Sequence, residues 1–368
     1  MFSEELEKIS WQDTTKSIYN KTYTDVERAL SKRSLDVDDF AALISPAAEP
    51  YLEHMARRSR EITLKRFGKT ISMYIPIYLS NACTNFCVYC GFNHNNKFLR
   101  TTLNDEEIVE ELKAIKRLGE FENLLIVTGE HPKIAGVDYL ENALQISRKY
   151  FANLSMEVMP LKQEEYSRLI EAGLRGVVCF QETYNKERYK VYHPRGMKSN
   201  FEWRVNGFDR MGTAGIHKIG MGVLIGLEDW RTDVVMLSTH LRYLQKHYWK
   251  TKYSVNFPRM RPSVGGFQPN VVLTDRELAQ LIFAFRIFDN DVDISISTRE
   301  CASLRDHLIS LGATSFSAGS KTEPGGYVGK QDSLEQFAID DNRAPSIVAS
   351  SIKAHGYEAV WKDWDNWL

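Results

Sequence analysis

Eight short segments rich in apolar and β-branched residues recur along the chain, and stretches with helical periodicity separate them. Helix signals frame these stretches: NDEEIVEELKAIKRLG opens at Asn104 and ends at Gly119, and TDRELAQLIFAFRIF opens at Thr274. The segments cover residues 74–80, 124–129, 154–160, 176–183, 218–227, 254–262, 293–298 and 313–320. Nearly all-apolar strands that alternate with helices predict a parallel (β/α)8 barrel of the TIM type, an α/β fold. An open, doubly wound sheet gives similar local patterns and stays an alternative.

Both ends of the chain lie outside these segments. Residues 1–70 read as helices, because apolar residues fall at helical spacing among charged ones and Gly68 is a stop signal. We expect an N-terminal helical extension over residues 1–70 and the barrel over residues 71–325. A C-terminal extension over residues 326–368 is expected to pack on or near the barrel.

Charge and composition limit the classes of partner. The chain has 368 residues, 43% of them hydrophobic, and a net charge of −1. Because no basic excess is present, a small-molecule substrate is favoured and no nucleic-acid partner is expected. The first ten residues lack the apolar core of a signal peptide, and residues 219–227 fall far short of the roughly 18 residues of a membrane span. We expect a cytoplasmic protein without membrane contact, in which the five cysteines stay reduced.

Polar and charged residues follow the apolar run in several of the eight segments. In a parallel barrel the carboxyl ends of all strands meet at one face, where substrates bind. The residues concerned are Ser80, Asn81, Thr128, Gly129, Glu130, Gln181, Glu182, Thr183, Arg259, Arg261, Thr298, Arg299, Glu300 and residues 317–320. The sequence therefore predicts a single site at this face of the barrel.

Three of the cysteines form the strongest local motif. Cys83, Cys87 and Cys90 lie in NACTNFCVYCGF, directly after the first strand segment, with the spacing C-x3-C-x2-C. Thiolates bind zinc and iron–sulfur clusters. A structural zinc site takes four ligands, and His94 is the candidate for the fourth. A 4Fe-4S cluster has four irons, so three cysteines leave one iron open. The spacing and the odd number of cysteines favour the cluster, and zinc stays the alternative.

The C-x3-C-x2-C segment resembles the signature of radical S-adenosylmethionine enzymes. The resemblance implies that the open iron binds the methionine end of S-adenosyl-L-methionine. One electron then cleaves the sulfonium bond and gives a 5′-deoxyadenosyl radical. It also implies that Tyr89, which precedes the last cysteine, packs on the adenine. The protein then supplies orientation and a closed cavity.

Further positions resemble the cosubstrate site of the same family. Thr128, Gly129 and Glu130 look like the motif that receives the methionine ammonium group, and Glu157 on the third strand is assigned to the cosubstrate with them. Glu182 resembles the acidic residue that binds the ribose. Arg204 resembles the arginine that holds the methionine carboxylate. Singly, such residues have ordinary structural explanations; jointly, at successive strand ends, they favour the functional interpretation.

The resemblance is closest to the aromatic amino acid lyases and covers nearly the whole chain. It rests on segments such as YLSNACTNFCVYCGF, LLIVTGEHP, MEVMPL, QETY, FPRMRP, STRE, FSAGSKTEPGGY and VWKDWDNWL. The tyrosine-cleaving branch implies that a hydrogen atom is taken from the amino group of L-tyrosine. The Cα–Cβ bond then breaks and gives 2-iminoacetate, for the thiazole of thiamine, and p-cresol. Tryptophan lyase is the alternative, because the sequence does not resolve the pocket for the ring.

The charges predicted at the site also suit an amino acid. Arg299, at the end of the seventh strand, offers a carboxylate two parallel hydrogen bonds, and the resemblance points to the same residue. Ser317 is expected to support that carboxylate, and Arg259 to add positive charge or to hold the cosubstrate. An ion pair of Arg299 with Glu300 or Asp306 is the alternative. No catalytic group beyond the cluster and the cosubstrate is expected.

The resemblance also implies partner proteins. They are thiazole synthase and an electron donor such as flavodoxin or ferredoxin. In the tail, Trp361, Trp364 and Trp367 recur every third residue; packing on the barrel is favoured, and a docking surface is the alternative. A related tyrosine lyase carries a second cluster on a C-terminal cysteine-rich segment, but no C-x2-C pair follows Cys90 here. A non-catalytic iron–sulfur carrier or sensor and a zinc-stabilised domain stay open.

Overall fold

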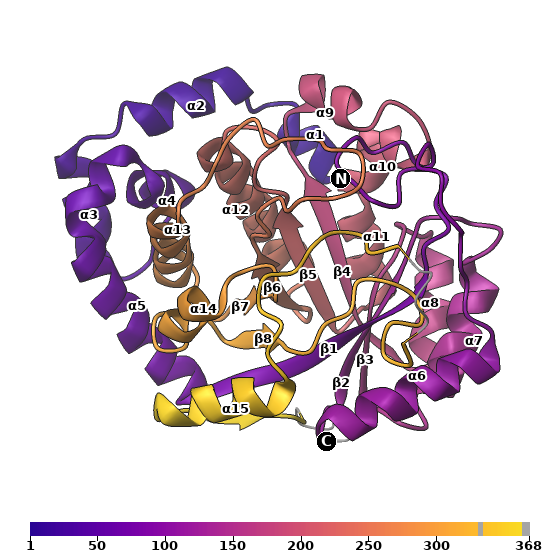
Figure 1. The fold of residues 1–368 in the computed structure, drawn as a ribbon. Coiled ribbons are helices and arrows are strands. Elements are labelled where there is room, and N and C mark those ends of the chain that lie inside the picture. The colour runs from indigo at the N-terminus through magenta and orange to yellow at the C-terminus, as the bar shows by residue number, and fades with distance from the viewer. Residues whose placement is uncertain (330–333, 363–368) are drawn as a thin grey trace.

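The computed structural model describes residues 1–329 and 334–362, and a closed barrel of eight parallel strands lies at its centre (Figure 1). The strands are β1 (Thr70–Ser80), β2 (Asn123–Thr128), β3 (Asn153–Glu157), β4 (Leu174–Glu182), β5 (Lys218–Val223), β6 (Lys252–Asn256), β7 (Asp293–Ile296) and β8 (Ser315–Ser317). Each strand pairs with the next one, and β1 pairs with both β2 and β8. The predicted (β/α)8 barrel is confirmed, and the open sheet is wrong.

Each predicted segment overlaps one strand, but five strands begin before the segment does, and several apolar runs continue beyond the end of the strand. β5 ends at Val223, yet Leu224, Ile225 and Leu227 after it are buried as well. Ile225 still forms an isolated parallel bridge with Arg259, beyond the end of β6. Other loops cover the loops at this face of the barrel. Their residues are therefore buried and apolar, and the sequence pattern extends the strand too far.

Helices surround the barrel, and their N-terminal signals act as predicted. Asn104 and Thr274 each form a capping box with the glutamate three residues later. The helices are α6 (Asp105–Leu118), α7 (Val137–Ser147), α8 (Gln163–Glu171), α9 (Lys186–Tyr192), α10 (Phe201–Val205), α11 (Gly207–Ala214), α12 (Trp230–His247), α13 (Asp275–Phe288) and α14 (Ala302–Leu308), with a 3-10 turn η2 (Met197–Ser199). One large apolar core fills the space between strands and helices.

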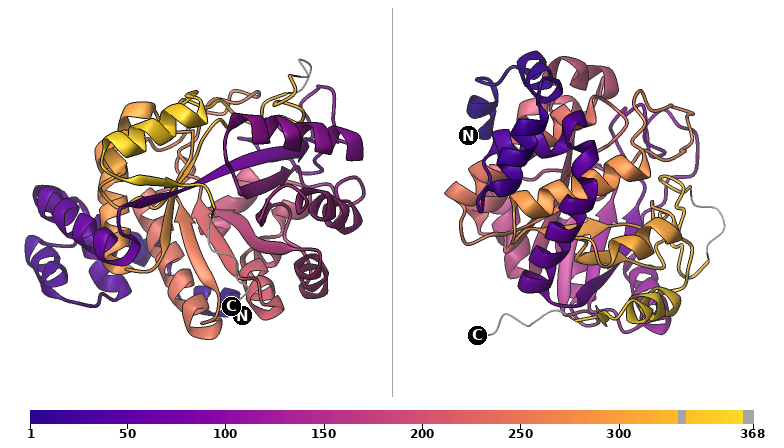
Figure 2. Two further views of the ribbon diagram at one scale, coloured as in Figure 1. Left: turned by 90° about the horizontal axis from the view of Figure 1, so that it is seen from below. Right: turned by 90° about the vertical axis from the view of Figure 1, so that its left-hand side faces the viewer.

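The N-terminal helices pack against the barrel helices α12 and α13, as Figure 2 shows for the indigo and orange segments. They are α1 (Phe2–Leu6), α2 (Trp11–Tyr19), α3 (Tyr23–Ser31), α4 (Val37–Ile44), η1 (Pro46–Tyr51) and α5 (Leu52–Phe67). The ring of Phe40 meets that of Phe285 edge-on, with centroids 4.8 Å apart. α5 ends at Gly68, whose φ of 66° is a left-handed conformation that glycine adopts without a steric penalty.

The C-terminal segment also packs on the barrel. It contains α15 (Pro345–Ala354) and β9 (Glu358–Val360), and β9 pairs in parallel with the first residues of β1. Trp361 packs edge-on against Phe121 with ring centroids 4.8 Å apart, whereas Trp364 and Trp367 lie outside the described residues. The division at residues 70 and 325 stays a prediction.

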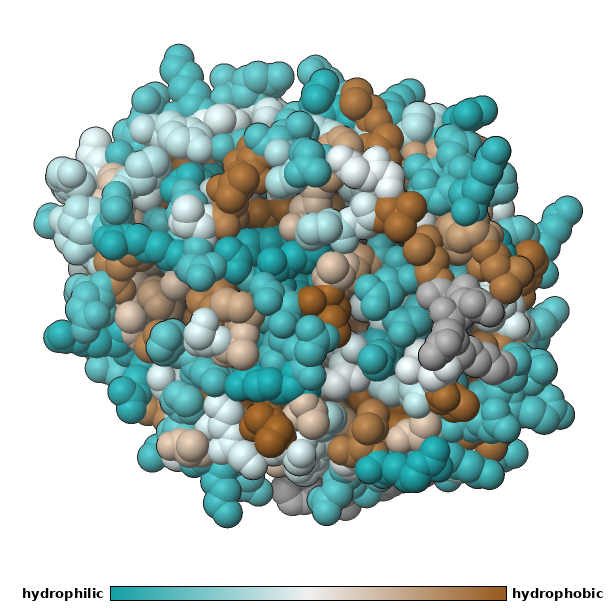
Figure 3. Space-filling view, viewed as in Figure 1, coloured by the Kyte–Doolittle hydropathy of each residue, from teal (hydrophilic) through white to brown (hydrophobic). Residues whose placement is uncertain are grey.

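The surface gives two further facts. No helix within residues 1–329 and 334–362 is long and apolar enough to cross a membrane. The face seen in Figure 1 is mostly hydrophilic, and its hydrophobic residues form small separate groups (Figure 3).

Candidate active site

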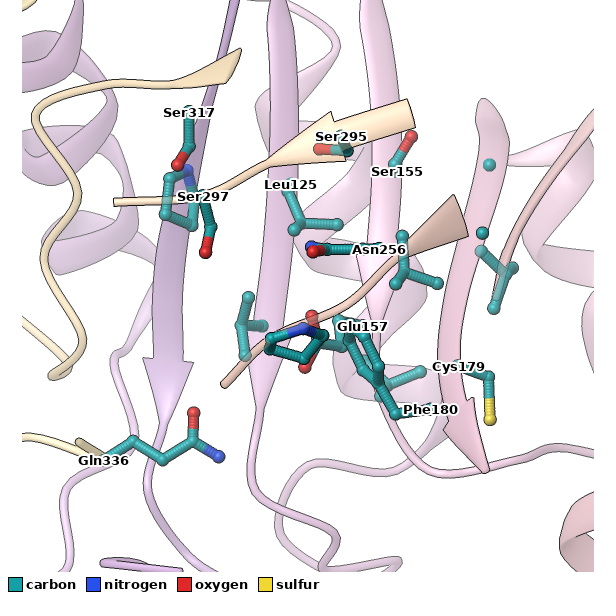
Figure 4. Close-up of a pocket in the computed structure, with 18 of the residues that line it drawn as sticks. Leu125, Ser155, Glu157, Cys179, Phe180, Asn256, Ser295, Ser297, Ser317 and Gln336 are labelled. Atoms are coloured by element: carbon teal, nitrogen blue, oxygen red, sulfur yellow. The ribbon is translucent and has the colours of Figure 1, made fainter. Parts of the chain in front are cut away.

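The barrel encloses a cavity of about 410 Å³ that all eight strands line. Bulky branched side chains usually fill the interior of a TIM barrel. Here the inward positions carry small polar residues such as Ser155 and Ser295, with Asn256 beside them (Figure 4). On β5, a Cβ atom at Gly222 would lie 2.4 Å from the carbonyl oxygen of Asn256, so only glycine fits there. Small inward residues therefore leave room for a ligand.

The three cysteines of the motif lie in the loop between β1 and α6, and all three line this cavity. Arg100 organises the loop, because its guanidinium donates hydrogen bonds to the carbonyl oxygens of Asn81 (2.8 Å) and Phe92 (2.8 Å). Burial raises the pKa of the Cys83 thiol to about 11, and it also raises the pKa values of Cys87 and Cys90. A metal centre that binds these thiols must therefore displace their protons.

The described residues offer no closed set of ligands for a single zinc ion. Around one zinc ion, with Zn–S bonds of about 2.3 Å, thiolates stand about 3.8 Å apart. In the described part of the chain no three His, Cys, Asp or Glu side chains are grouped closely enough to hold one ion. Nδ1 of His94 lies 3.1 Å from the carbonyl oxygen of Cys83, so the backbone orients this ring. A 4Fe-4S cluster binds each cysteine through a different iron, which suits three separated thiols.

A glutamine from the C-terminal segment reaches the same loop. Nε2 of Gln336 lies 3.7 Å from Sγ of Cys90, and the Tyr78 hydroxyl donates a 2.8 Å hydrogen bond to Oε1 of Gln336. Gln336 is thus oriented to donate to the sulfur. Hydrogen bonds to cluster sulfurs raise the reduction potential of an iron–sulfur centre.

Beside the cysteine loop, two carboxylates and two cations form a matched network. Arg204 donates a 2.9 Å hydrogen bond to Glu130, whose other oxygen accepts one of 2.7 Å from Asn85. Lys198 donates a 2.6 Å hydrogen bond to Glu182. Burial opposes ionisation of Glu130, but Arg204 and Lys198 hold the pKa of its carboxyl below the usual range. The structure therefore brings the predicted residues Glu130, Glu182 and Arg204 together.

Two backbone features shape this side of the cavity. Glu182 has a φ of 71° and lies at a bulge in the pairing of β4 with β5. Non-glycine residues in this left-handed region are strained, and such strain gathers at functional sites. Thr128 lines the cavity, and Gly129 lies so close to the loop that a Cβ atom would be 2.3 Å from the carbonyl oxygen of Ala82.

Tyr89 is held by a buried histidine. Nε2 of His193 lies 2.7 Å from the Tyr89 hydroxyl, and Nδ1 lies 2.9 Å from the carbonyl oxygen of Tyr189. Because Nδ1 must donate to that carbonyl, Nε2 is the acceptor and the Tyr89 hydroxyl is the donor. The ring of Tyr89 therefore lines the cavity in a fixed orientation.

The predicted substrate residues are placed differently from one another. Arg299 lines the cavity with its guanidinium 3.3 Å from the centroid of Phe337, and Ser317 lines it nearby. The alternative for Arg299, an ion pair with Glu300 or Asp306, is not formed within the described residues. Glu300 binds Arg259, and Asp306 binds Arg343. Nε of Arg259 lies 2.9 Å from the Glu300 carboxylate, and Arg259 is not among the cavity-lining residues.

Glu157 ends β3 and lines the cavity without a hydrogen bond or ion pair to any described residue. Burial raises the pKa of its carboxyl to about 7, against the opposing effect of Arg299. Figure 4 shows it among the residues that line the pocket. This carboxylate therefore makes no hydrogen bond with the described residues of the matched network, although the charges of Glu182, Lys198 and Arg204 act on its pKa.

Sequence reasoning missed several groups that the fold brings to the site. Lys198 and Asn85 complete the matched network, and Gln336 and Phe337 approach from beyond β8. Asn85 stands inside the cysteine motif and could have been noticed for that reason. Nothing in the local sequence marks the others, because each meets its partner only through the fold.

Known proteins are similar to this chain over its full length. The Radical SAM superfamily model matches residues 77–237, and the Biotin and Thiamin Synthesis associated domain matches residues 256–358. The 2-iminoacetate synthase of Salmonella typhimurium is 48% identical over 100% of this chain and 97% of that protein. The 2-iminoacetate synthase of Escherichia coli is 47% identical over the same shares.

A solved structure agrees with this relationship. The FeFe-hydrogenase maturase HydG from Carboxydothermus hydrogenoformans superposes with a TM-score of 0.89 at 29% identity, over 97% of this chain and 84% of that one. Methylornithine synthase, with a TM-score of 0.73 at 20% identity, shares the fold. Because 48% identity extends over the whole length, the chain belongs to the 2-iminoacetate synthase family of radical SAM enzymes, which work with a 4Fe-4S cluster and S-adenosylmethionine.

Proposed function

We propose that the protein cleaves the Cα–Cβ bond of L-tyrosine and releases 2-iminoacetate and p-cresol, with methionine and 5′-deoxyadenosine as the products of the cosubstrate. The observation that carries the proposal is the guanidinium group of Arg299, which lies in the cavity that the three thiols line. It stacks on Phe337 but has no hydrogen bond or ion pair to any described residue. A buried arginine of this kind suits a ligand carboxylate, which it binds through two parallel hydrogen bonds. The full-length likeness to two proteins named 2-iminoacetate synthase supports the reaction.

The cofactor side of the site has a clear division of roles. Cys83, Cys87 and Cys90 hold the 4Fe-4S cluster, which together with S-adenosylmethionine supplies a 5′-deoxyadenosyl radical. Around the cosubstrate, Glu130 and Arg204 offer opposite charges to the ammonium and carboxylate of its methionine part. Glu182 offers its carboxylate to the ribose, and Tyr89 its ring to the adenine. Thr128 and Gly129 bring backbone groups close to the same region.

The substrate side fixes the amino acid. Arg299 binds the carboxylate, and Ser317 supports it. Arg259 acts from outside the cavity: it holds Glu300 and so stabilises the loop that carries Arg299. The ring enters the barrel interior, where small residues such as Ser155 and Ser254 leave space. The rest of the barrel keeps bulk water away from a reactive intermediate.

Partner proteins complete the proposal. The relatives' name and the match to a domain associated with thiamine synthesis support thiazole synthase as the protein that receives the iminoacetate. An electron donor such as flavodoxin or ferredoxin reduces the cluster, and the reaction takes place in the cytoplasm.

Product identification tests the function. The protein is reconstituted with iron and sulfide without oxygen and incubated with S-adenosylmethionine, dithionite and either tyrosine or tryptophan. We expect p-cresol and 5′-deoxyadenosine from tyrosine, and neither product when dithionite is left out. If 3-methylindole formed from tryptophan and no p-cresol from tyrosine, the protein would be a tryptophan lyase. Cluster absorption without any 5′-deoxyadenosine would indicate an iron–sulfur carrier, and zinc without sulfide a zinc-stabilised domain.

A further inference from the structure

Two opposite charges face the cavity without an ionic or hydrogen-bonding partner in the described part of the chain. Arg299 follows β7 and Glu157 ends β3, and both line the cavity. Within residues 1–329 and 334–362, neither side chain makes a hydrogen bond or an ion pair. An unpaired charge that is largely removed from water is costly, so a ligand of opposite charge would lower the free energy of both groups. Among the charges that act on the pKa of Glu157, that of Arg299 has the largest effect, and it opposes the effect of burial.

The other carboxylates of the cavity already have partners. Glu130 binds Arg204, Glu182 binds Lys198, and Asp293 binds Lys218 at 2.5 Å. Of the carboxylates that line the cavity in the described residues, Glu157 is thus the one left for a ligand cation. An amino acid carries one carboxylate and one ammonium group on the same carbon atom, and the pair Arg299 and Glu157 offers the complementary charges.

We propose that Glu157 binds the α-ammonium group of the amino acid substrate and takes from it the proton that must leave before the hydrogen atom is abstracted. This inference rests on the proposed function, and it adds a catalytic side chain that neither the sequence nor the family resemblance supplied. It also moves Glu157 from the cosubstrate, where the sequence placed it, to the substrate.

The proton transfer is balanced and needs no further reactant. One N–H bond of the ammonium group breaks, its proton goes to a carboxylate oxygen of Glu157, and the electron pair stays on nitrogen. The amine then carries no positive charge when the hydrogen atom leaves, which avoids forming a radical on a cationic nitrogen. The products of this step are a neutral amine and a protonated Glu157, and no oxidation takes place.

The surroundings of Glu157 suit an acceptor of this kind. Arg299 from beyond β7, Lys198 from η2 and Arg204 from α10 favour its charged form, whereas burial and Glu182 on β4 oppose it. Tyr78 on β1 also faces it and is neutral, since burial raises the pKa of its hydroxyl well above 10. The pKa of Glu157 near 7 makes it a stronger base than an ordinary carboxylate.

The first test measures protons on binding, without turnover. Cluster-loaded protein with S-adenosylmethionine, but without a reductant, is titrated with tyrosine and, separately, with tryptophan in two buffers of different ionisation enthalpy. At pH 6 the free carboxyl of Glu157 is mostly protonated, so pairing with the ammonium group releases about 0.9 proton in the wild type. At pH 8.5 the release is close to zero. Glu157→Gln should release no proton at either pH.

The second test measures turnover against pH. In the wild type, kcat/KM for tyrosine should fall below about pH 7, because a protonated Glu157 accepts no further proton. Glu157→Gln should lose this acidic limb and lower tyrosine-dependent kcat by about 100-fold or more. Glu157→Asp should keep the limb at a reduced rate. Glu164→Gln, on the exposed first turn of α8, should match the wild type.

The outcomes separate this inference from the proposed function. Equal proton release by wild type and Glu157→Gln at pH 6 overturns it, and so does an unchanged kcat/KM in that variant. Loss of S-adenosylmethionine binding in Glu157→Gln, with tyrosine-linked proton release intact, returns the residue to the cosubstrate. If the wild type makes no p-cresol, the proposed function fails, and the proton count still reports whether Glu157 meets the ammonium group of the amino acid that binds.

Discussion

Two sets of charges in the cavity differ in whether the folded chain pairs them: the matched network beside the cysteine loop, and the unmatched pair Arg299 and Glu157. Beside the cysteine loop, Arg204 neutralises Glu130 and Lys198 neutralises Glu182, with hydrogen bonds that the folded chain makes by itself. Arg299, which follows β7, has no such partner among the described residues, and neither has Glu157, although Glu157 ends β3 between the strands that lead to Glu130 and Glu182. The matched network is preorganised, so it presents fixed dipoles to a cosubstrate. In our proposal the charges of Arg299 and Glu157 are matched only when the amino acid binds.

The largest effect is expected when one thiol of the cysteine loop is removed. Changing any one of Cys83, Cys87 and Cys90 to alanine should abolish cosubstrate cleavage, because the cluster then loses a ligand. Iron, sulfide and 5′-deoxyadenosine are measured. Cys179→Ala is the matched control, since Cys179 is a buried residue of β4 and should leave cleavage largely intact. Persistent cleavage in a variant of the motif would break the assignment.

A second test breaks one matched pair. Lys198→Met should lower the free energy of unfolding by about 1–3 kcal/mol, because it removes the hydrogen-bonded cation of Glu182 and leaves this carboxylate only the longer contact of 3.8 Å to Arg204. Denaturant titration measures the loss. The double variant Lys198→Met/Glu182→Gln removes both charges and should recover much of it. If the single and double variants were equally stable, the pairing would not contribute as stated.

In the unmatched pair, Arg299→Ala should lower tyrosine-dependent turnover by about 100-fold. This factor corresponds to the loss of one charged hydrogen-bonded contact, that with the substrate carboxylate. Cosubstrate cleavage without tyrosine should be partly spared, because Arg299 lies apart from the matched network. Arg259→Ala is the comparison, since Arg259 binds Glu300 outside the cavity lining and should have the smaller effect. Equal loss of both activities in Arg299→Ala would remove this residue from the substrate clamp.

The raised pKa of Glu157, in the unmatched pair, should also make the free energy of unfolding depend on pH. The folded protein holds the proton of Glu157 up to about pH 7, whereas an exposed carboxyl loses it near 4.5. Between these values the folded state binds more protons, so the stability of the wild type falls as pH rises through the window. Glu157→Gln lacks this term and should gain up to about 3 kcal/mol relative to the wild type between pH 4.5 and pH 8. Parallel stability curves would contradict the raised pKa.

Arg259 is a residue that the sequence predicted in the common site but that does not line the cavity in the structure. The sequence placed it at the end of the sixth strand and therefore in the common site. In the structure β6 already ends at Asn256, and the loop that follows directs Arg259 to Glu300 and Asp275, with a 2.7 Å contact to Asp275. Two residues of loop are enough to turn a side chain from the cavity to the rim, and a hydropathy pattern does not contain that turn.

The sequence by itself determined the barrel, the motif of three thiols and the family, because strand periodicity and cysteine spacing are local properties of the chain. Only the tertiary structure decided which charges neutralise one another. Arg204 meets Glu130 across 74 residues of sequence, and Gln336 meets Cys90 across 246. Coulombic interactions depend on distance and burial in the folded state. The difference between the matched network and the unmatched pair is therefore a property of the fold.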